Sequence, residues 1–100
     1  MSPPTVEFHP DAIADGRHAR EYYRTRSPQA EELFRRDLEH AIGQIREHPE
    51  TWPRYLHGTQ RYILRTCPYS VVYRRSWQGS LVLAIAHAKR RAAYWRPRLP

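Results

Sequence analysis

The second half of the chain carries most of the side chains that could do chemistry, and it carries them without any carboxylate. Residues 51–100 contain ten lysines and arginines but no aspartate or glutamate. The proton donors, acceptors and nucleophiles available there are His57, Cys67, His87, Lys89 and several tyrosines. Acid–base chemistry in this half would therefore depend on histidine, unless a carboxylate from the first half folds back onto it.

The histidines and the single cysteine match no metal-binding pattern. His57, Cys67 and His87 lie far apart in the sequence and lack zinc-ligand spacing. Cys67 has no Cys-His-Asn signature, and a lone cysteine beside a strand is usually part of the core. We therefore expect no metal and no cofactor. His87 remains open between a proton-transfer group and an imidazole that is hydrogen-bonded within a sheet, and the second interpretation is favoured.

The C-terminal tail interleaves cations with aromatic rings. Its residues of this kind are Lys89, Arg90, Arg91, Tyr94, Trp95, Arg96 and Arg98. Arginine and lysine bind anions, and aromatic faces stack on bases or on cations. Residues Lys89 to Arg96 are thus a candidate nucleic-acid-binding or target-binding surface. In the alternative, the two aromatics pack the tail against helices, while the arginines are solvated or contact an acidic partner.

The charge is divided unevenly along the chain. All ten acidic residues lie between Glu7 and Glu50, together with seven arginines, so that half has a formal charge of −3 against +10 for the other. Such a split predicts a polyanionic or acidic partner.

Hydrophobic periodicity predicts the elements that position these residues. Alternation at 5–9 indicates a strand, and three- and four-residue steps indicate helices at about 10–25 and 27–48. Strand-like runs follow at 61–66, 69–74 and 81–87, the last of them central because it is apolar on both faces. The apolar helical positions include Ile13, Gly16, Ala19, Tyr23, Leu33 and Phe34, and Tyr22 and Trp77 are expected in the core or at its boundary.

These elements predict an α+β fold: an N-terminal strand, an antiparallel helical hairpin, then a three-stranded antiparallel meander in one sheet packed against the helices. A length of 100 residues indicates a single domain, 1–100. No apolar run approaches the roughly 20 residues that span a bilayer, and Met1-Ser2-Pro3-Pro4 lacks the features of a signal peptide. With one cysteine and hence no internal disulfide, a reducing cytoplasm is expected.

In this order and spacing the chain resembles the RelE/ParE superfamily, the toxins of bacterial type II toxin–antitoxin pairs, from about Val6 to Arg98. The resemblance rests on Val6-Glu7-Phe8 before Ala12, Pro49 with Trp52-Pro53, Arg61 with Leu64, Pro68 to Tyr73, and Ala86 to Trp95. It implies a cognate antitoxin that wraps the toxin and folds as it binds, with any oligomer formed through that antitoxin.

The resemblance leaves two targets open. RelE-like toxins cut messenger RNA on the ribosome without a metal, and in that case Arg61, Arg65 and His87 are the catalytic candidates. ParE-like toxins poison DNA gyrase. Ser70 and Ile63 stand where RelE has basic residues, which favours the ParE-like branch. A basic nucleic-acid-binding module without toxicity is a third possibility.

Overall fold

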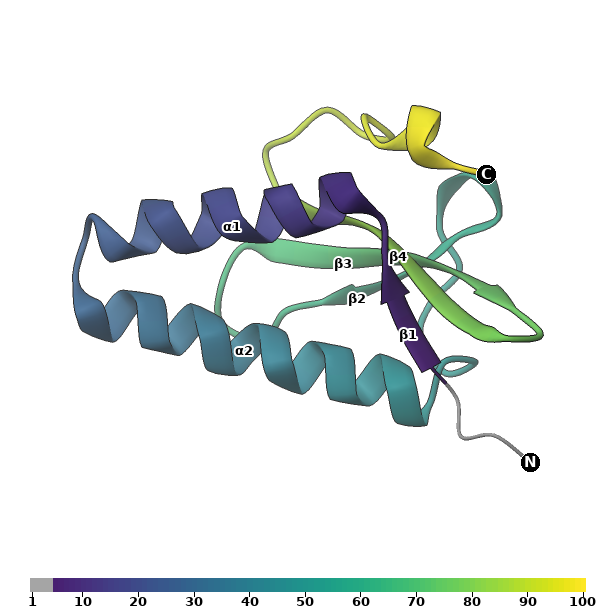
Figure 1. The fold of residues 1–100 in the computed structure, drawn as a ribbon, viewed down its shortest axis with the longest axis horizontal. Helices are drawn as coiled ribbons and strands as arrows, with labels where there is room; N and C mark the ends of the chain where they lie inside the picture. Colours follow the sequence, from purple (N-terminus) through teal and green to yellow (C-terminus); the bar gives the residue numbers. More distant parts are fainter. Residues whose placement is uncertain (1–4) are drawn as a thin grey trace.

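The computed structural model describes residues 5–100, and Met1–Pro4, where the sequence predicts no signal peptide, lie outside it. Figure 1 shows the elements in order. They are β1 (Thr5–Phe8), α1 (Pro10–Arg24), α2 (Pro28–Glu47), β2 (Gln60–Ile63), β3 (Tyr69–Ser76) and β4 (Gly79–His87), with short 3-10 turns at Leu56–Gly58 and Arg96–Arg98. The predicted α+β class is confirmed.

Local signals start both helices of the hairpin. The His9 imidazole accepts the Asp11 amide at 3.0 Å, and the Ser27 hydroxyl accepts the Ala30 amide at 3.0 Å. A proline follows each cap, where its missing N–H costs nothing. Two polar residues thus fix where the hairpin begins and turns.

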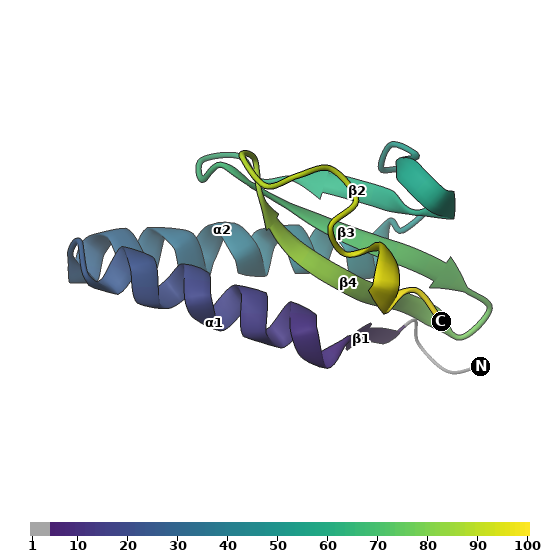
Figure 2. The ribbon, with the colours of Figure 1, turned by 90° about the horizontal axis from the view of Figure 1, so that it is seen from above.

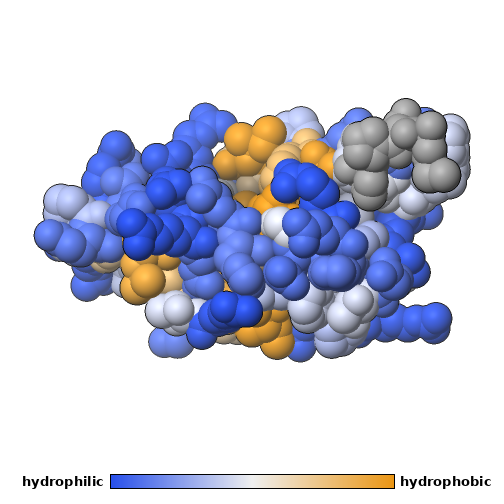
Figure 3. All heavy atoms as spheres, turned by 90° about the horizontal axis from the view of Figure 1, so that it is seen from below, coloured by the Kyte–Doolittle hydropathy of each residue, from blue (hydrophilic) through white to orange (hydrophobic). Residues whose placement is uncertain are grey.

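One face of the hairpin packs on the sheet, and the other is hydrophilic. Phe34, Ala41 and Ile45 are fully buried. On the outer side, Arg35 pairs with Glu32 and Glu39 across single helical turns. Seen from the α2 side, the surface is mostly hydrophilic, with apolar residues in separate patches (Figure 3). The helices of residues 5–100 are not long and apolar enough to cross a membrane.

Within residues 5–100 the sheet has the order β1-β4-β3-β2, with β1 parallel to β4 and the other pairs antiparallel. The central position predicted for β4 is confirmed. At its start, a Cβ on Gly79 would lie 2.3 Å from the Thr5 carbonyl oxygen. Only glycine therefore allows β1 to approach the turn so closely.

A β-bulge allows side chains of β4 to pack into hydrophobic clusters on both faces of the sheet. Val72 pairs with Ala84 while Tyr73 pairs with Val82, so Leu83 has no partner in β3. Leu83 and Ala84 consequently face the same side, with Val72, whereas Val82 faces the helices. The C-terminal tail covers that second face, away from the helices (Figure 2).

The structure corrects several predictions. The strand expected at 61–66 is β2, and it ends at Ile63. The amides of Arg65, Thr66 and Cys67 turn to bind Asp37, so Arg65 lies in a loop. Trp77 is 92 % exposed at the β3–β4 turn, rather than in the core or at its boundary. Ile13 and Leu33 lie on exposed sides of their helices, where Ala12 and Phe34 take the buried positions.

Candidate functional site

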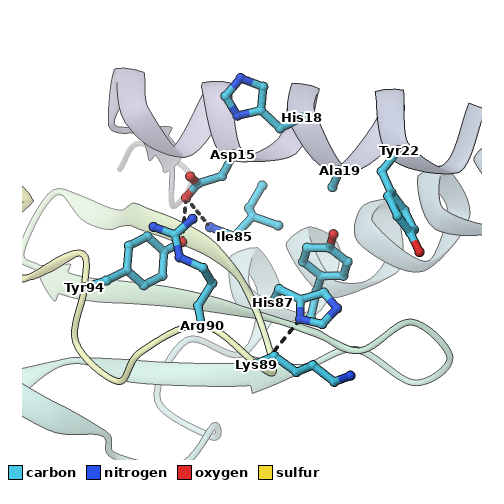
Figure 4. Close-up of a pocket in the computed structure, with 10 residues that line it drawn as sticks. Asp15, His18, Ala19, Tyr22, Ile85, His87, Lys89, Arg90 and Tyr94 are labelled. Atoms are coloured by element: carbon cyan, nitrogen blue, oxygen red, sulfur yellow. Dashed lines mark hydrogen bonds between the residues drawn. The ribbon is translucent and has the colours of Figure 1, made fainter.

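A hollow of about 390 Å³ lies between α1 and the point where β4 runs into the tail (Figure 4). Its walls come from α1, β3, β4 and the C-terminal tail. The lining residues are Asp15, His18, Ala19 and Tyr22 of α1, Tyr69 of β3, Ile85 and His87 of β4, and Lys89, Arg90 and Tyr94 of the tail. The fold thus brings candidates predicted from the tail together with α1 residues that the sequence did not single out.

His87 is fixed at one end of this hollow. Its Nδ1 atom accepts the Lys89 amide at 3.0 Å, so the neutral ring carries its proton on Nε2. The Tyr69 ring meets the imidazole edge to face, with 5.0 Å between ring centroids. His87 is therefore an oriented imidazole with one nitrogen still free to bind a ligand.

Asp15 is the centre of a network that ties the tail to α1 and β4. Its carboxylate accepts hydrogen bonds from the Ile85 amide at 3.1 Å, the Tyr94 hydroxyl at 3.1 Å and the Arg98 guanidinium at 2.7 Å. Arg98 also donates to the Leu83 carbonyl at 3.0 Å. Because β1 pairs with β4 only as far as Val82, Asp15 and Arg98 satisfy backbone groups on the edge of β4 that β1 leaves uncovered.

The network also sets the electrostatics of the hollow. The Asp15–Arg98 pair is largely buried, with side-chain exposures of 11 % and 15 %. Burial, followed by the negative charge of Asp15, raises the pKa of Tyr94 to about 12. Tyr94 therefore remains a hydrogen-bond donor at neutral pH, and its ring stacks under the Arg90 guanidinium at 3.8 Å.

A second, smaller hollow of about 150 Å³ lies on the sheet face beneath the tail. Arg61, Ser70, His87 and Arg91 are among its lining residues, so two of the three predicted catalytic residues meet there. The Arg61 guanidinium lies over the Tyr55 ring at 4.2 Å. Arg65 does not join them, because its amide is bound to Asp37 in the loop after β2.

The remaining tail candidates separate into a buried anchor and exposed cations. Trp95 is 1 % exposed, packed against Val72, Leu83 and Ala84, so its indole is not available to a partner. It packs the tail onto the sheet rather than onto the helices. Lys89, Arg91 and Arg96 are exposed.

Sequence reasoning missed Asp15, Tyr22, Tyr69 and Arg98 as site residues. The available signal was the lack of acids after Glu50, which requires any acidic side chain near the tail to come from the first half of the chain. Which helical carboxylate does so depends on packing. Among residues 5–100, no group of three histidine, cysteine or acidic side chains could hold a metal ion.

The comparisons with known proteins define the class. One solved chain, in a structure described as the chromosomal ParDE TA system from P. aeruginosa, has the same fold: the TM-score is 0.75 at 15 % identity, covering 87 % of this chain and 98 % of that chain. The ParE toxin of type II toxin-antitoxin system, parDE, is the family whose model matches residues 6–92, so the chain belongs to the ParE toxin family. No curated protein matches the chain significantly in sequence. The predicted RelE/ParE resemblance, with its ParE-like branch, is confirmed.

Proposed function

We propose that this toxin arrests growth in the cytoplasm by binding DNA gyrase through its C-terminal tail, and that a cognate antitoxin neutralises it. The observation that carries the proposal is that the tail is anchored by one buried residue and exposes its cations. Trp95 anchors it to the sheet, while Lys89, Arg90, Arg91 and Arg96 are exposed. Tyr94 lies partly exposed among these cations. An anchored, cationic surface of this kind suits recognition of a macromolecular target.

The antitoxin is expected to associate through an acidic segment. The −3 and +10 charges of the two halves favour attraction of such a segment to the second half, and steering of this kind raises the association rate more than the affinity. Any larger assembly would form through the antitoxin.

The alternative, message cleavage on the ribosome, is favoured by one observation: Arg61 and His87 line the same small hollow. Against it, that hollow is smaller than the roughly 300–1,000 Å³ of typical ligand sites. Arg65 lies elsewhere, and Ser70 brings no positive charge to the hollow. His87 would have to serve both as acid and as base there, unless a tyrosine or a ribosomal group shared the task.

Inducing the chain alone, and then measuring DNA breaks and message cleavage over time, tests the proposal. We expect gyrase-dependent DNA damage first, and arrest relieved by co-expression of the antitoxin. His87→Ala should reduce toxicity far less than the about hundred- to ten-thousand-fold loss in rate that removal of a general acid–base group causes. Thermal unfolding controls for misfolding.

Other outcomes contradict the proposal in different ways. A folded His87→Ala protein that neither arrests growth nor cleaves messages that the wild type cleaves would establish the ribonuclease alternative. Unchanged growth at good soluble yield would contradict any toxin and favour a non-toxic nucleic-acid-binding module.

A further inference from the structure

The larger hollow has a net positive charge because its only carboxylate is already neutralised. Asp15 is paired with Arg98 at 2.7 Å. Lys89 and Arg90 have no acidic side chain within salt-bridge distance in the described part of the chain. Two cations thus remain to meet an anion brought by a ligand.

The floor of the hollow is apolar. Ala19 and Ile85 are buried and line it from α1 and β4. Tyr22 stands at the far wall, 50 % exposed, and its hydroxyl accepts a 2.6 Å hydrogen bond from Arg26. Figure 4 shows Tyr22 and His87 facing the space that Arg90 and Tyr94 close on the other side. A ligand that fits must combine an anionic group with an apolar body.

Asp15 positions the Arg90 guanidinium through Tyr94. It accepts the Tyr94 hydroxyl, and the Tyr94 ring supports the Arg90 guanidinium at 3.8 Å. Arg98, bound to the same carboxylate, also lies over that ring, at 5.1 Å. Weakening the bonds to Asp15 would therefore loosen Tyr94 and, with it, Arg90.

We propose that this hollow is where the toxin engages its target, that it accepts an acidic protein segment carrying a large apolar side chain, and that Asp15 is its positioning residue. The proposal rests on the proposed function and names the site and the chemistry of the segment recognised. The segment's carboxylate meets Arg90, while Lys89 adds positive charge at the rim of the hollow. The segment's apolar side chain lies on Ala19 and Ile85 against Tyr22.

A protein segment fits these walls better than a nucleic-acid backbone. Phosphate tracking needs a continuous stripe of cations, whereas here the Arg90 guanidinium lies over Tyr94 and the Lys89 side chain points to another side of the hollow (Figure 4), above an apolar floor. The volume of about 390 Å³ suits one or two side chains. Charged groups at the rim of such contacts provide selectivity, and the buried apolar contact provides affinity.

The test measures inhibition of supercoiling by purified DNA gyrase holoenzyme with the full toxin and matched variants. Arg90→Glu and Tyr22→Ala each change the proposed contact, and Arg74→Glu is the matched control, because Arg74 is an exposed arginine of β3 outside the hollow. We expect the first two to raise the inhibitory concentration at least about tenfold, since a lost interfacial charge pair or a lost aromatic anchor has effects of that order. The control should leave it unchanged. Thermal unfolding verifies that each variant is folded.

Asp15 is tested against its neighbour Asp11, which is 64 % exposed and 3.8 Å from Arg98. Asp15→Asn should weaken inhibition several-fold, and Asp11→Asn should not. Adding Asp15→Asn to Arg90→Glu should cause little further loss, because the two changes act through one contact. A merely structural effect of Asp15 would add to that of Arg90.

The outcomes separate the two proposals. If the wild type inhibits gyrase and folded Arg90→Glu and Tyr22→Ala inhibit it equally well, the hollow is not the engaged site, although the gyrase proposal stands. If the wild type arrests growth without inhibiting gyrase, the gyrase proposal fails, and the same variants are compared in the growth assay. Unchanged arrest by both variants there overturns the hollow as the target site.

Discussion

Two aspartates of the helices accept hydrogen bonds from the second half of the chain, which has no acidic side chains, and their partners differ in kind. Asp37 of α2 is 8 % exposed and accepts the amides of Arg65, Thr66 and Cys67 at 2.8–3.2 Å. Asp15 of α1 accepts one amide, that of Ile85, together with the Tyr94 hydroxyl and the Arg98 guanidinium. The first holds a loop by its backbone, and the second holds a tail mainly by side chains.

Because their partners differ, Asp37 should matter mainly for stability and Asp15 mainly for function. Backbone amides are present whatever the loop sequence is, so Asp37 specifies where a loop lies and not which side chains it presents. The partners of Asp15 are particular residues that stand next to Arg90 and the hollow. A change at Asp37 should therefore act on folding, and a change at Asp15 should act mainly on the tail.

The largest expected effect on stability is that of Asp37→Ala. Three amides lose a charged acceptor at once, and an unmet buried donor costs about 1–3 kcal/mol, so we expect a loss of about 3 kcal/mol in the free energy of unfolding. Urea unfolding measures it. Glu39→Ala, an exposed position on the same helix, is the control and should change stability by less than about 0.5 kcal/mol. Equal effects of the two substitutions would refute the structural role of Asp37.

Asp15→Asn should cost less in global stability, about 1–2 kcal/mol, because one amide oxygen still accepts hydrogen bonds. Its main effect should be local: amide exchange at Tyr94 to Leu99 should speed up while the β2–β3 amides remain protected. A double-mutant cycle with Arg98→Gln should give a coupling of about 0.5–3 kcal/mol. Strict additivity would mean that the 2.7 Å contact contributes no interaction energy.

The architecture could be predicted because it is encoded locally. Helical periodicity, strand alternation and the apolar faces of β4 are properties of short windows, and they predicted the helices, the meander and the centre of the sheet. The buried anchor Trp95 and the loop that contains Arg65 could not be placed in this way. Each depends on a contact between distant segments, of Trp95 with Leu83 and of Asp37 with the loop amides.

The candidate site was predicted in part for the same reason. The tail cations and His87 could be identified from residue types in the sequence alone. The other walls of the hollow, Tyr22 and Tyr69, come from α1 and β3, and only packing brings them together. A charge count did indicate that a carboxylate near the tail must come from the first half, but nothing in the sequence distinguishes Asp15 from Asp11.

Tyr94→Phe should change how the stability of the protein depends on pH, because the Tyr94 hydroxyl is part of the Asp15 network. The pKa of Tyr94 is raised to about 12 in the fold from 10.0, so between these values the unfolded chain loses its phenolic proton first and stability falls as pH rises. Removing the hydroxyl should cost about 1 kcal/mol at pH 7 and make the alkaline loss shallower. Urea midpoints at pH 8 and pH 11 provide the measurement, and an unchanged slope would contradict it.

The smallest expected effect is kinetic and reports on Asp37 through its neighbour Cys67. Burial raises the pKa of the Cys67 thiol, so in the folded protein the reactive thiolate is scarce. A thiol reagent should therefore label the native chain much more slowly than the urea-unfolded chain. Asp37→Asn weakens the 2.8 Å hydrogen bond that the Cys67 amide donates to this side chain. Weakening the loop by about 1 kcal/mol should speed labelling about fivefold if local opening limits the reaction.

Asp15→Asn should leave the labelling rate nearly unchanged, because its partners lie on the tail and on β4. Equal acceleration by both substitutions would show that the two carboxylates stabilise one cooperative unit, and the division between loop and tail would then be wrong.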